Sequence, residues 1–195
     1  MQPETFVFFG IVGSGKGTQV QLLMDFLKKK DGKESVYAYP GAEYRKLIET
    51  KSYTASLIKA SIERGELQPD FLTNSIFTDI LIRSLTSEEH LIADGYPRTI
   101  VQSESFDAMM KFFKRDFVKV IYIEVGRDEA LKRNLLRGRA DDTEDGIAKR
   151  FDEYINNVIP AMDYFRDKEN YTMYEINGEQ SVEDVHQDII KALGY

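Results

Sequence analysis

The chain has 195 residues, no cysteine and a formal net charge of −7 at pH 7. This length suits one substantial hydrophobic core with small insertions and is short for two full domains. With a pI near 5.0, the surface should repel nucleic acid polymers, so a site for a polyanion must be a local basic patch. A chain without cysteine holds neither a disulfide nor a thiolate-bound zinc, which fits a reducing compartment.

The first residues lack the features of a targeting segment. The chain enters an apolar stretch at Phe6, without the basic, apolar and small-residue progression of a signal peptide. No apolar run approaches the length of about 18 residues that a membrane-spanning helix needs. We therefore expect a cytoplasmic protein that binds neither a membrane nor a nucleic acid polymer.

Residues 5–18, TFVFFGIVGSGKGT, predict a strand, a glycine-rich turn and a helix in immediate succession. The apolar run at 6–9 is typical of a strand buried on both faces. Glycines let the backbone N–H groups surround an anion, the next helix presents the positive end of its dipole, and Lys16 can reach the outer phosphates of a nucleotide. The context therefore predicts a phosphate cradle rather than a flexible loop with a surface lysine.

The cradle departs from the GxxxxGKS/T pattern at one position. Gly17 directly follows Lys16, and Thr18 comes one residue later. The hydroxyl that usually binds magnesium in this pattern is therefore displaced.

Helix and strand patterns alternate through the rest of the chain. Strands are predicted at 35–39, 91–94, 117–125 and 171–176, and helices at 17–30, 42–50, 54–64, 70–85, 100–114, 127–137, 143–167 and 182–193. This alternation predicts an α/β fold with a five-stranded parallel sheet and helices on both faces. No strand separates the three helices between 42 and 85, so we expect them to stand apart as a small helical insertion.

Two charged features accompany the cradle. Asp94 ends a predicted buried strand, where open parallel sheets bind ligands, so we expect it near the cradle. Arg133 and Arg137 share one helix face, and Arg139 and Arg150 follow across a short loop. Each arginine alone could be ordinary surface charge. Together, in an acidic protein, they indicate a clamp for a transferring phosphoryl group.

In these motifs the chain resembles the adenylate kinases, within the nucleoside monophosphate kinases. The resemblance covers nearly the whole chain and is carried by residues 10–18, Gly41 with Arg45, and residues 65–70, 94–102 and 137–143. It implies a single P-loop nucleoside monophosphate kinase domain over 1–195, with a mobile helical acceptor-binding insertion at about 40–70 and a very short lid loop at about 137–143. It also implies a monomer that transfers the γ-phosphoryl group of ATP reversibly to AMP, with Mg²⁺ and without zinc.

The resemblance assigns roles to individual residues. Donor ATP would be held by Gly13, Ser14, Gly15, Lys16, Gly17, Thr18, Arg133, Arg137 and Gln180. The acceptor would be held by Pro40, Arg45, Glu66, Leu67, Gln68, Gly95, Tyr96, Pro97, Arg98, Gln102, Arg139 and Arg150. The catalytic charges would be Lys16, Arg98, Arg133, Arg137, Arg139 and Arg150. Asp94 would hold magnesium mostly through water, in agreement with the displaced Thr18.

The acceptor base is indicated by one residue and left open by another. Gln102 lies where the family reads AMP, and a glutamine amide can pair with an adenine edge through two hydrogen bonds. Where adenylate kinases usually have Thr-Gly-Asp, however, this chain has Pro40, Gly41 and Ala42, so a hydroxyl near the acceptor nucleoside is missing. We favour AMP. The alternatives are a kinase for UMP, CMP or dTMP and a nucleotide-binding module without turnover.

The lid is short because only Gly138 separates Arg137 from Arg139. Exclusion of water from the reaction would then depend on this arginine loop and on closure of the 40–70 insertion. The donor base would lie between the loop and the turn at 178–180. We therefore expect loose selectivity for the donor base.

Several conspicuous residues are interpreted as structural. His90 and His186 have no partner at the spacing of a metal site or a catalytic triad. Core faces are the preferred interpretation for Met109, Met110, Phe112, Phe113 and the aromatic residues of the helix at 143–167. In the family, Asp141 and Asp142 are better interpreted as partners of the arginines than as a second metal site.

Overall fold

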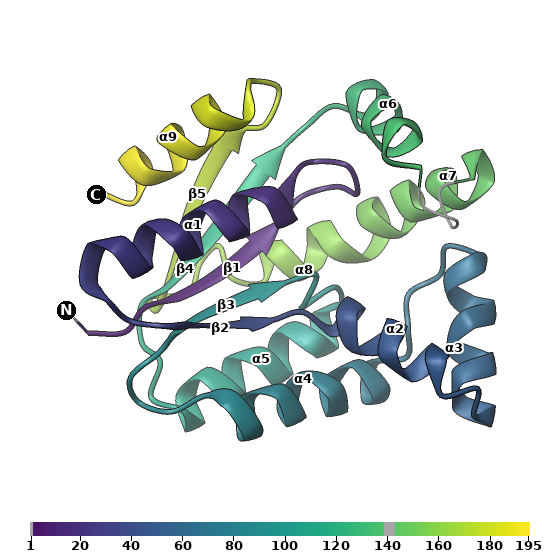
Figure 1. Cartoon of the computed structure of the whole chain (residues 1–195), viewed down its shortest axis with the longest axis horizontal. Coiled ribbons are helices and arrows are strands. Elements are labelled where there is room, and N and C mark those ends of the chain that lie inside the picture. Colours follow the sequence, from purple (N-terminus) through teal and green to yellow (C-terminus); the bar gives the residue numbers. More distant parts are fainter. Residues whose placement is uncertain (1, 139–142) are drawn as a thin grey trace.

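The structure is a computed structural model that describes residues 2–138 and 143–195. At its centre lies a five-stranded sheet in the order β2-β3-β1-β4-β5, in which every neighbouring pair is parallel. The strands are β1 (Thr5–Phe9), β2 (Ser35–Ala38), β3 (His90–Asp94), β4 (Val118–Glu124) and β5 (Tyr171–Asn177). The predicted α/β fold with a parallel sheet is confirmed (Figure 1).

Helices connect the strands. They are α1 (Lys16–Asp31), α2 (Pro40–Glu49), α3 (Tyr53–Glu63), α4 (Asp70–Ser84), α5 (Ile100–Phe112), α6 (Arg127–Arg137), α7 (Glu144–Glu153), α8 (Ile159–Asp163) and α9 (Val182–Ala192), with a π-helical turn η1 (Tyr154–Val158) between α7 and α8. No helix in the two described ranges is long and apolar enough to cross a membrane.

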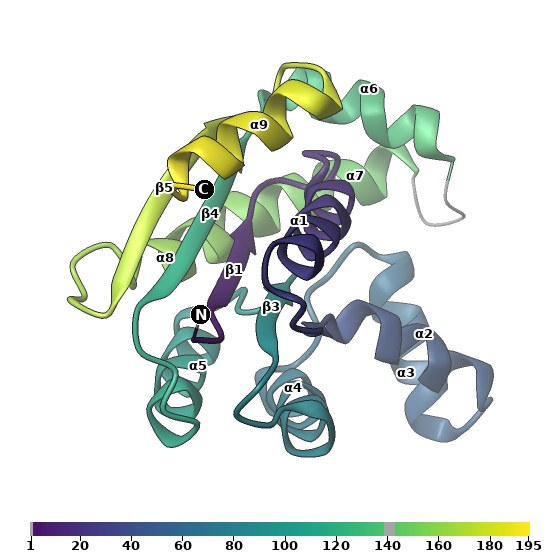
Figure 2. The same cartoon turned by 60° about the vertical axis from the view of Figure 1, so that its left-hand side comes forward.

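The central strand β1 divides the core into two layers. Successive side chains of a strand point to opposite faces. Phe6 and Phe8 lie in a cluster with residues of α1, α7 and α9, whereas Val7 and Phe9 lie in a second cluster with residues of α4 and α5. Figure 2 shows α1 and α9 on one side of the sheet and α4 and α5 on the other. The prediction that this strand is buried on both faces is confirmed.

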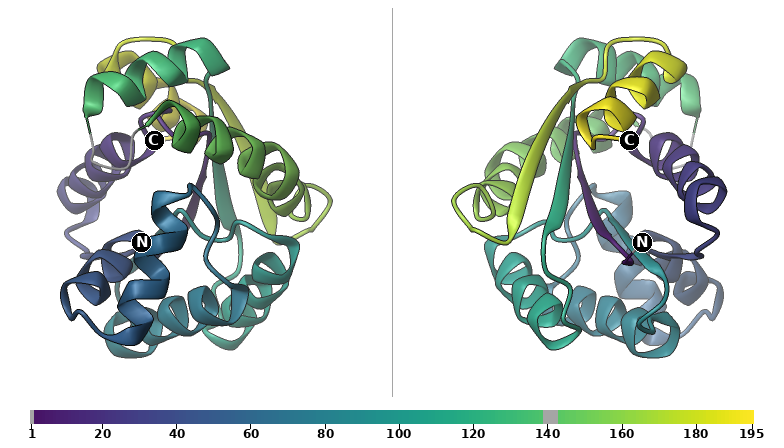
Figure 3. Two further views of the ribbon diagram at one scale, coloured as in Figure 1. Left: turned by 90° about the vertical axis from the view of Figure 1, so that its right-hand side faces the viewer. Right: turned by 90° about the vertical axis from the view of Figure 1, so that its left-hand side faces the viewer.

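The helices between β2 and β3 do not behave alike. In Figures 1 and 3, α2 and α3 extend away from the sheet, whereas α4 lies beneath it next to α5. Phe77 and Leu81 of α4 are fully buried in the core cluster of β1 and α5. The expectation that all three helices stand apart is therefore wrong for α4, because its apolar side chains four residues apart face the sheet.

Proline accounts for two differences in helix boundaries. Pro40 begins α2, two residues before the predicted start, because its fixed φ suits the first helical position. The single helix predicted over 143–167 is interrupted by η1 and ends at Asp163. Pro160 has no N–H to donate back along the helix. Beside it, the N–H of Ile159 bonds to the carbonyl of Tyr154 five residues earlier.

One predicted core residue of α5 lies at the surface. Phe106 and Met110 are buried, and Met109 and Phe113 pack against the same cluster, but Phe112 is 79% exposed. The prediction for Phe112 is wrong because a residue six positions after Phe106 lies on a different side of the helix.

The histidines have structural surroundings. His90 is fully buried in β3, where Nδ1 accepts a hydrogen bond from the N–H of Glu4 at 3.0 Å. Its Nε2 lies 3.2 Å from a carboxylate oxygen of Asp31. His186 lies edge-on to the ring of Phe26. The structural interpretation of His90 is confirmed by these partners.

Candidate functional site

The turn between β1 and α1 exposes backbone donors to a ligand. Inside the turn, the N–H of Ser14 bonds to the carbonyl of Ile11 at 3.1 Å. The N–H groups of Thr18 and Gln19 both donate to the carbonyl of Gly15. The backbone N–H groups just before them, at the first turn of α1, have no carbonyl within the helix to bond. Such N–H groups, at the positive end of the helix dipole, are suited to bind an anion.

Lys16 folds back into this turn. Its Nζ donates to the carbonyl oxygens of Gly10 at 2.6 Å and Ile11 at 3.0 Å. Burial lowers the pKa of Lys16 to about 8. The carboxylate of Asp94 acts to raise it, whereas Arg98 and Arg137 act to lower it. The ammonium group therefore sits where the charges of β3, the following loop and α6 meet.

The turn is anchored to α6 by a residue that the sequence did not reveal. Asn134 is fully buried, and its Nδ2 donates to the carbonyl of Val12 at 2.9 Å and to that of Ala130 at 2.7 Å. Gly13 has a φ of +90°, and a Cβ there would lie 2.5 Å from Nδ2 of Asn134. The sequence offered one signal for Asn134, namely a polar residue four positions after Ala130 on the same face of the helix. Its bond to Val12, 122 residues away, was not predictable.

Asp94 lies at the end of β3 next to the cradle strand, as predicted. It is opposite Phe8 of β1 in the strand register and is 5% exposed. Its Oδ2 accepts a hydrogen bond of 2.7 Å from the hydroxyl of Tyr37. Burial and the charge of Asp94 raise the pKa of Tyr37, so this hydroxyl stays a donor well above neutral pH.

The acidic groups constrain how a metal could bind. Across residues 2–138 and 143–195, no group of three or more His, Cys, Asp or Glu residues could hold a metal ion. A lone carboxylate fits Mg²⁺ bound mainly by nucleotide phosphates and water, because magnesium keeps several waters and takes one or two carboxylates.

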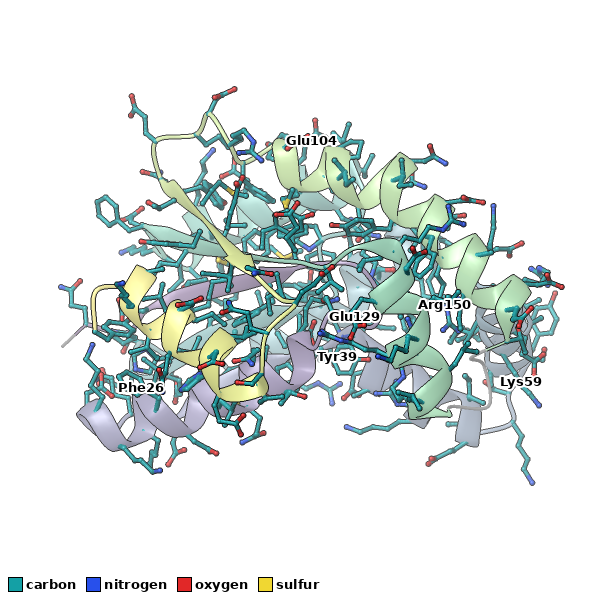
Figure 4. All side chains as sticks on the ribbon, turned by 90° about the horizontal axis from the view of Figure 1, so that it is seen from above. Phe26, Tyr39, Lys59, Glu104, Glu129 and Arg150 are labelled. Carbon is teal, nitrogen blue, oxygen red and sulfur yellow. The ribbon has the colours of Figure 1, made fainter. Side chains whose placement is uncertain are left out.

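Three of the predicted arginines, Arg133, Arg137 and Arg150, lie on α6 and α7. Arg133 donates through Nε to Glu129 at 2.8 Å and through Nη1 to the carbonyl of Gly178 at 3.0 Å, which joins α6 to the turn after β5. Arg137 ends α6, and Arg150 lies on α7, which packs against α6 (Figure 4). The predictions for Arg139, Asp141 and Asp142 lie outside the described residues.

The predicted acceptor residues divide into exposed and engaged side chains. Arg45 on α2 is exposed, and its guanidinium lies 5.2 Å from the ring centroid of Tyr39. Arg98 is also exposed, and its Nε donates to the carbonyl of Gly95 at 2.8 Å. Pro40 and Pro97 are buried and Leu67 is half-buried.

The segment after α3 lies against α7. Glu66 pairs with Arg64 at 2.7 Å, and Nε2 of Gln68 donates to the hydroxyl of Ser61 at 2.6 Å. A Cβ on Gly65 would lie 2.6 Å from the carbonyl oxygen of Gly146. This contact brings the predicted acceptor segment beside the helix that carries Arg150, as the left view of Figure 3 shows for the two chain segments.

Gln102 occupies the predicted acceptor region, with its amide already bonded inside the protein. Oε1 accepts from the N–H of Arg98 and Nε2 donates to Asp70, both at 2.8 Å. The side chain is 1% exposed. The amide keeps one further hydrogen and one further lone pair, so a base that approaches it would share these atoms with Asp70 and Arg98.

The side chains of two other predicted site residues, Tyr96 and Gln180, pack or bond within the protein. The ring of Tyr96 stacks on Phe77 with centroids 4.1 Å apart and is 1% exposed, so an acceptor would meet the backbone at this position. Nε2 of Gln180 donates to Asp188 at 2.8 Å and to the carbonyl of Asn177 at 3.0 Å. Its amide therefore faces α9 and its own turn.

Comparison with known proteins identifies relatives that match most of the chain. The sequence matches the family described as Adenylate kinase over residues 8–170. An adenylate kinase of Azobacteroides pseudotrichonymphae is 32% identical to this chain, with 95% of the chain and 94% of the relative covered. An adenylate kinase of Bacteroides fragilis is also 32% identical, with 96% of each covered. One of Thermosipho africanus is 29% identical, with 96% of this chain and 98% of the relative covered. The chain therefore belongs to the adenylate kinase family.

Proposed function

We propose that this protein is an adenylate kinase, which transfers the γ-phosphoryl group of ATP reversibly to AMP and yields two ADP. The observation that carries the proposal is the convergence of charge on the turn after β1. Lys16 bonds within that turn, and Asp94, Arg98 and Arg137 lie near enough to act on its pKa. Phosphoryl transfer requires chiefly positioning and the neutralisation of charge, which such a site supplies.

The cradle residues Gly13, Ser14, Gly15, Gly17 and Thr18 would bind the donor phosphates mainly through their backbone. Lys16 would exchange the carbonyl oxygens of the turn for phosphate oxygens, as its flexible side chain permits. Arg133 lies next to the turn at 177–178 and would support the donor base, with Gln180 at the rim. Arg137 would face the phosphates from the end of α6.

Mg²⁺, when bound with ATP, neutralises charge on the phosphate oxygens. Asp94 is the residue that would hold it, through water. The hydroxyl of Tyr37 occupies one acceptor position of this carboxylate. An ionised carboxylate has about four such positions, so others remain for water.

The acceptor would enter from the side of α2 and α3. Arg45 and Arg98 are exposed there, and Arg150 lies on the facing helix. With Arg139 they would grip the acceptor phosphate and the migrating group, since guanidinium groups match phosphate oxygens in pairs. Gln102 would read adenine through the hydrogen and the lone pair that its internal bonds leave over.

Turnover with a panel of acceptors tests the proposal. In a coupled assay with ATP and Mg²⁺, we expect the kcat/KM for AMP to exceed those for UMP, CMP, GMP and dTMP by about tenfold or more, because a missing base contact costs at least this much. A different preferred acceptor would identify another nucleoside monophosphate kinase. Tight ATP binding without turnover would identify a binding module.

We also propose that residues 40–70 act as the mobile acceptor unit and residues 137–143 as a short lid, in a cytoplasmic monomer. The support for a separate unit is that α2 and α3 extend away from the sheet, whereas α4 joins the core. Hydrogen exchange with and without both nucleotides tests this division. Slowed exchange confined to α4 and the sheet would contradict it.

A further inference from the structure

Tyr37 and Tyr39, at the end of β2, contact Asp94 and Arg45 respectively, and they also contact each other. Tyr37 and Tyr39 are two residues apart, so their side chains leave the extended backbone on the same side. Their rings stack with centroids 5.6 Å apart and an angle of 16° between the planes. Both side chains are half-buried. The two rings therefore form one aromatic stack beside the carboxyl end of β3.

One end of this stack fixes Asp94. The hydroxyl of Tyr37 donates to Oδ2 of Asp94 at 2.7 Å, from a strand that is paired directly with β3. Because Asp94 is 5% exposed, little water competes for this bond. The bond restricts rotation of the carboxylate and determines which way its other oxygen points.

The other end of the stack meets Arg45. The guanidinium carbon of Arg45 lies 5.2 Å from the ring centroid of Tyr39, and Nη1 lies 3.5 Å from its hydroxyl. A guanidinium over an aromatic face is attracted by the negative face of the ring. An exposed side chain with many rotamers is thereby held in one direction.

The chain backbone fits closely around Tyr39. A Cβ on Gly41 would lie 2.6 Å from the ring, and a Cβ on Gly95 would lie 3.5 Å from it. The ring thus rests against the first turn of α2 and against the residue that follows Asp94. Figure 4 shows Tyr39 near the middle of the view, whereas Lys59 of α3 lies at the edge. The ring of Tyr39 therefore packs against Gly41 on the acceptor side and against Gly95, which follows the proposed metal-binding residue Asp94.

We propose that Tyr37 and Tyr39 form a positioning bridge that holds the metal-binding carboxylate of Asp94 and the phosphate-binding guanidinium of Arg45 in one fixed arrangement. The inference rests on the proposed function, because that function gives Asp94 and Arg45 their ligands. The bridge acts through Asp94 and Arg45, so its two tyrosines are positioning residues. It consists of the hydrogen bond from Tyr37 to Asp94, the stack of the two tyrosine rings and the contact of Arg45 with Tyr39. A substitution can remove each contact separately.

The metal end is tested by Tyr37→Phe. The affinity of the ATP complex for Mn²⁺, measured by electron paramagnetic resonance, should fall about fivefold, the size of effect expected for the loss of one hydrogen bond. The matched control is Tyr171→Phe, which removes a buried tyrosine hydroxyl that donates from the start of β5 to Asp107 of α5 at 3.0 Å. Tyr171→Phe should lower the thermal midpoint without changing Mn²⁺ affinity.

The acceptor end is tested by Tyr39→Leu, which keeps an apolar side chain and removes the ring. Calorimetry without metal should show about threefold weaker AMP binding, since an exposed cation on a ring contributes about this much. Tyr39→Phe retains the ring and should restore most of the affinity. Tyr37→Phe should leave AMP binding in the absence of metal within about twofold.

The double variant decides whether the two ends form one bridge. Tyr39→Leu should also weaken Mn²⁺ binding, by about twofold, and the double variant should lose less Mn²⁺ affinity than the product of the single effects. Unchanged Mn²⁺ affinity in Tyr37→Phe overturns the bridge, and so do multiplicative effects in the double variant. The Mn²⁺ measurement needs only bound ATP. A wild-type protein that fails to phosphorylate AMP therefore refutes the proposed function separately from the bridge.

Discussion

In the proposed function, the cradle and the acceptor side would recognise their ligands with different parts of the chain. The cradle presents backbone N–H groups between β1, all of whose residues are buried, and α1. The acceptor side presents side chains, with Arg45 and Arg98 exposed and Gln102 bonded into a network with Asp70. Backbone donors recognise phosphate whatever the base, whereas an amide side chain can select one base. We therefore expect selectivity to reside on the acceptor side and phosphate binding in the cradle.

The largest effect should follow from the charge inside the cradle. Lys16→Met removes the ammonium group that bonds to the carbonyls of Gly10 and Ile11. It thereby removes the positive charge that would neutralise the transferred phosphoryl group. We expect kcat to fall about a hundredfold to a thousandfold. Lys29→Met, the same change in the exposed last turn of α1, is the matched control for steady-state kinetics.

Circular dichroism and the thermal midpoint should show that Lys16→Met remains folded. A folded variant with only a severalfold loss of kcat would contradict the role assigned to Lys16. It would also remove the main support for placing phosphate binding in the cradle.

The next effect should follow from the backbone of the cradle. In Gly13→Ala, the new methyl group would lie 2.5 Å from Nδ2 of Asn134 and 2.6 Å from the carbonyl oxygen of Ala130, at a φ of +90°. The turn must then move away from α6, and a shift of about 1 Å can lower kcat/KM about a hundredfold. Steady-state kinetics with ATP varied measures this loss.

Gly17→Ala offers a comparison within the same loop. A Cβ on Gly17 meets no atom within 4 Å, so this variant should lose clearly less activity than Gly13→Ala. Equal losses would show that the approach of the turn to Asn134 does not matter. Recognition by the cradle would then depend less on its backbone than we infer.

The same contrast explains how far the sequence could predict the structure. The strand, turn and helix at 5–18 were predictable because an apolar run, closely spaced glycines and an adjacent helix pattern are local signals. The position of Asp94 beside β1 followed from the rule that parallel sheets bind ligands at the carboxyl ends of their strands. These parts of the cradle are therefore specified by local sequence signals, although Asn134 anchors the turn from 122 residues away.

Side-chain pairings and helix packing were less predictable because they depend on residues far apart in the sequence. The bond from Tyr37 to Asp94 joins residues 57 positions apart, and that from Gln102 to Asp70 joins residues 32 apart. The burial of α4 depends on which helix face meets the sheet, and several of its faces carry apolar residues. Pairings between specific side chains therefore had to be taken from the structure.

A smaller effect should appear in the pH dependence of ATP binding to the cradle. Burial lowers the pKa of Lys16 to about 8, below its ordinary 10.5. A bound phosphate favours the charged form and raises this pKa again. ATP binding should therefore be fully supported below pH 8 and weaken by several fold towards about pH 9, with uptake of a proton.

Calorimetry in buffers of different ionisation enthalpy measures this proton uptake directly. At such pH values the phosphates of ATP are already ionised, so the proton belongs to the protein. Lys16→Met is the control and should take up none. Equal uptake in both proteins would assign the proton to another group and would leave the lowered pKa without a part in binding.

The smallest effect should be the discrimination between donor bases. Arg133 is held by Glu129 and by the carbonyl of Gly178. In the proposed site it would present a planar group to the donor base, and stacking tolerates every base. Gln180 directs its amide to Asp188 and Asn177. We therefore expect kcat/KM values for ATP, GTP and CTP that agree within about threefold, whereas the acceptor bases should differ by about tenfold or more. A donor preference as strong as the acceptor preference would show that both sides read the base, and the comparison between them would fail.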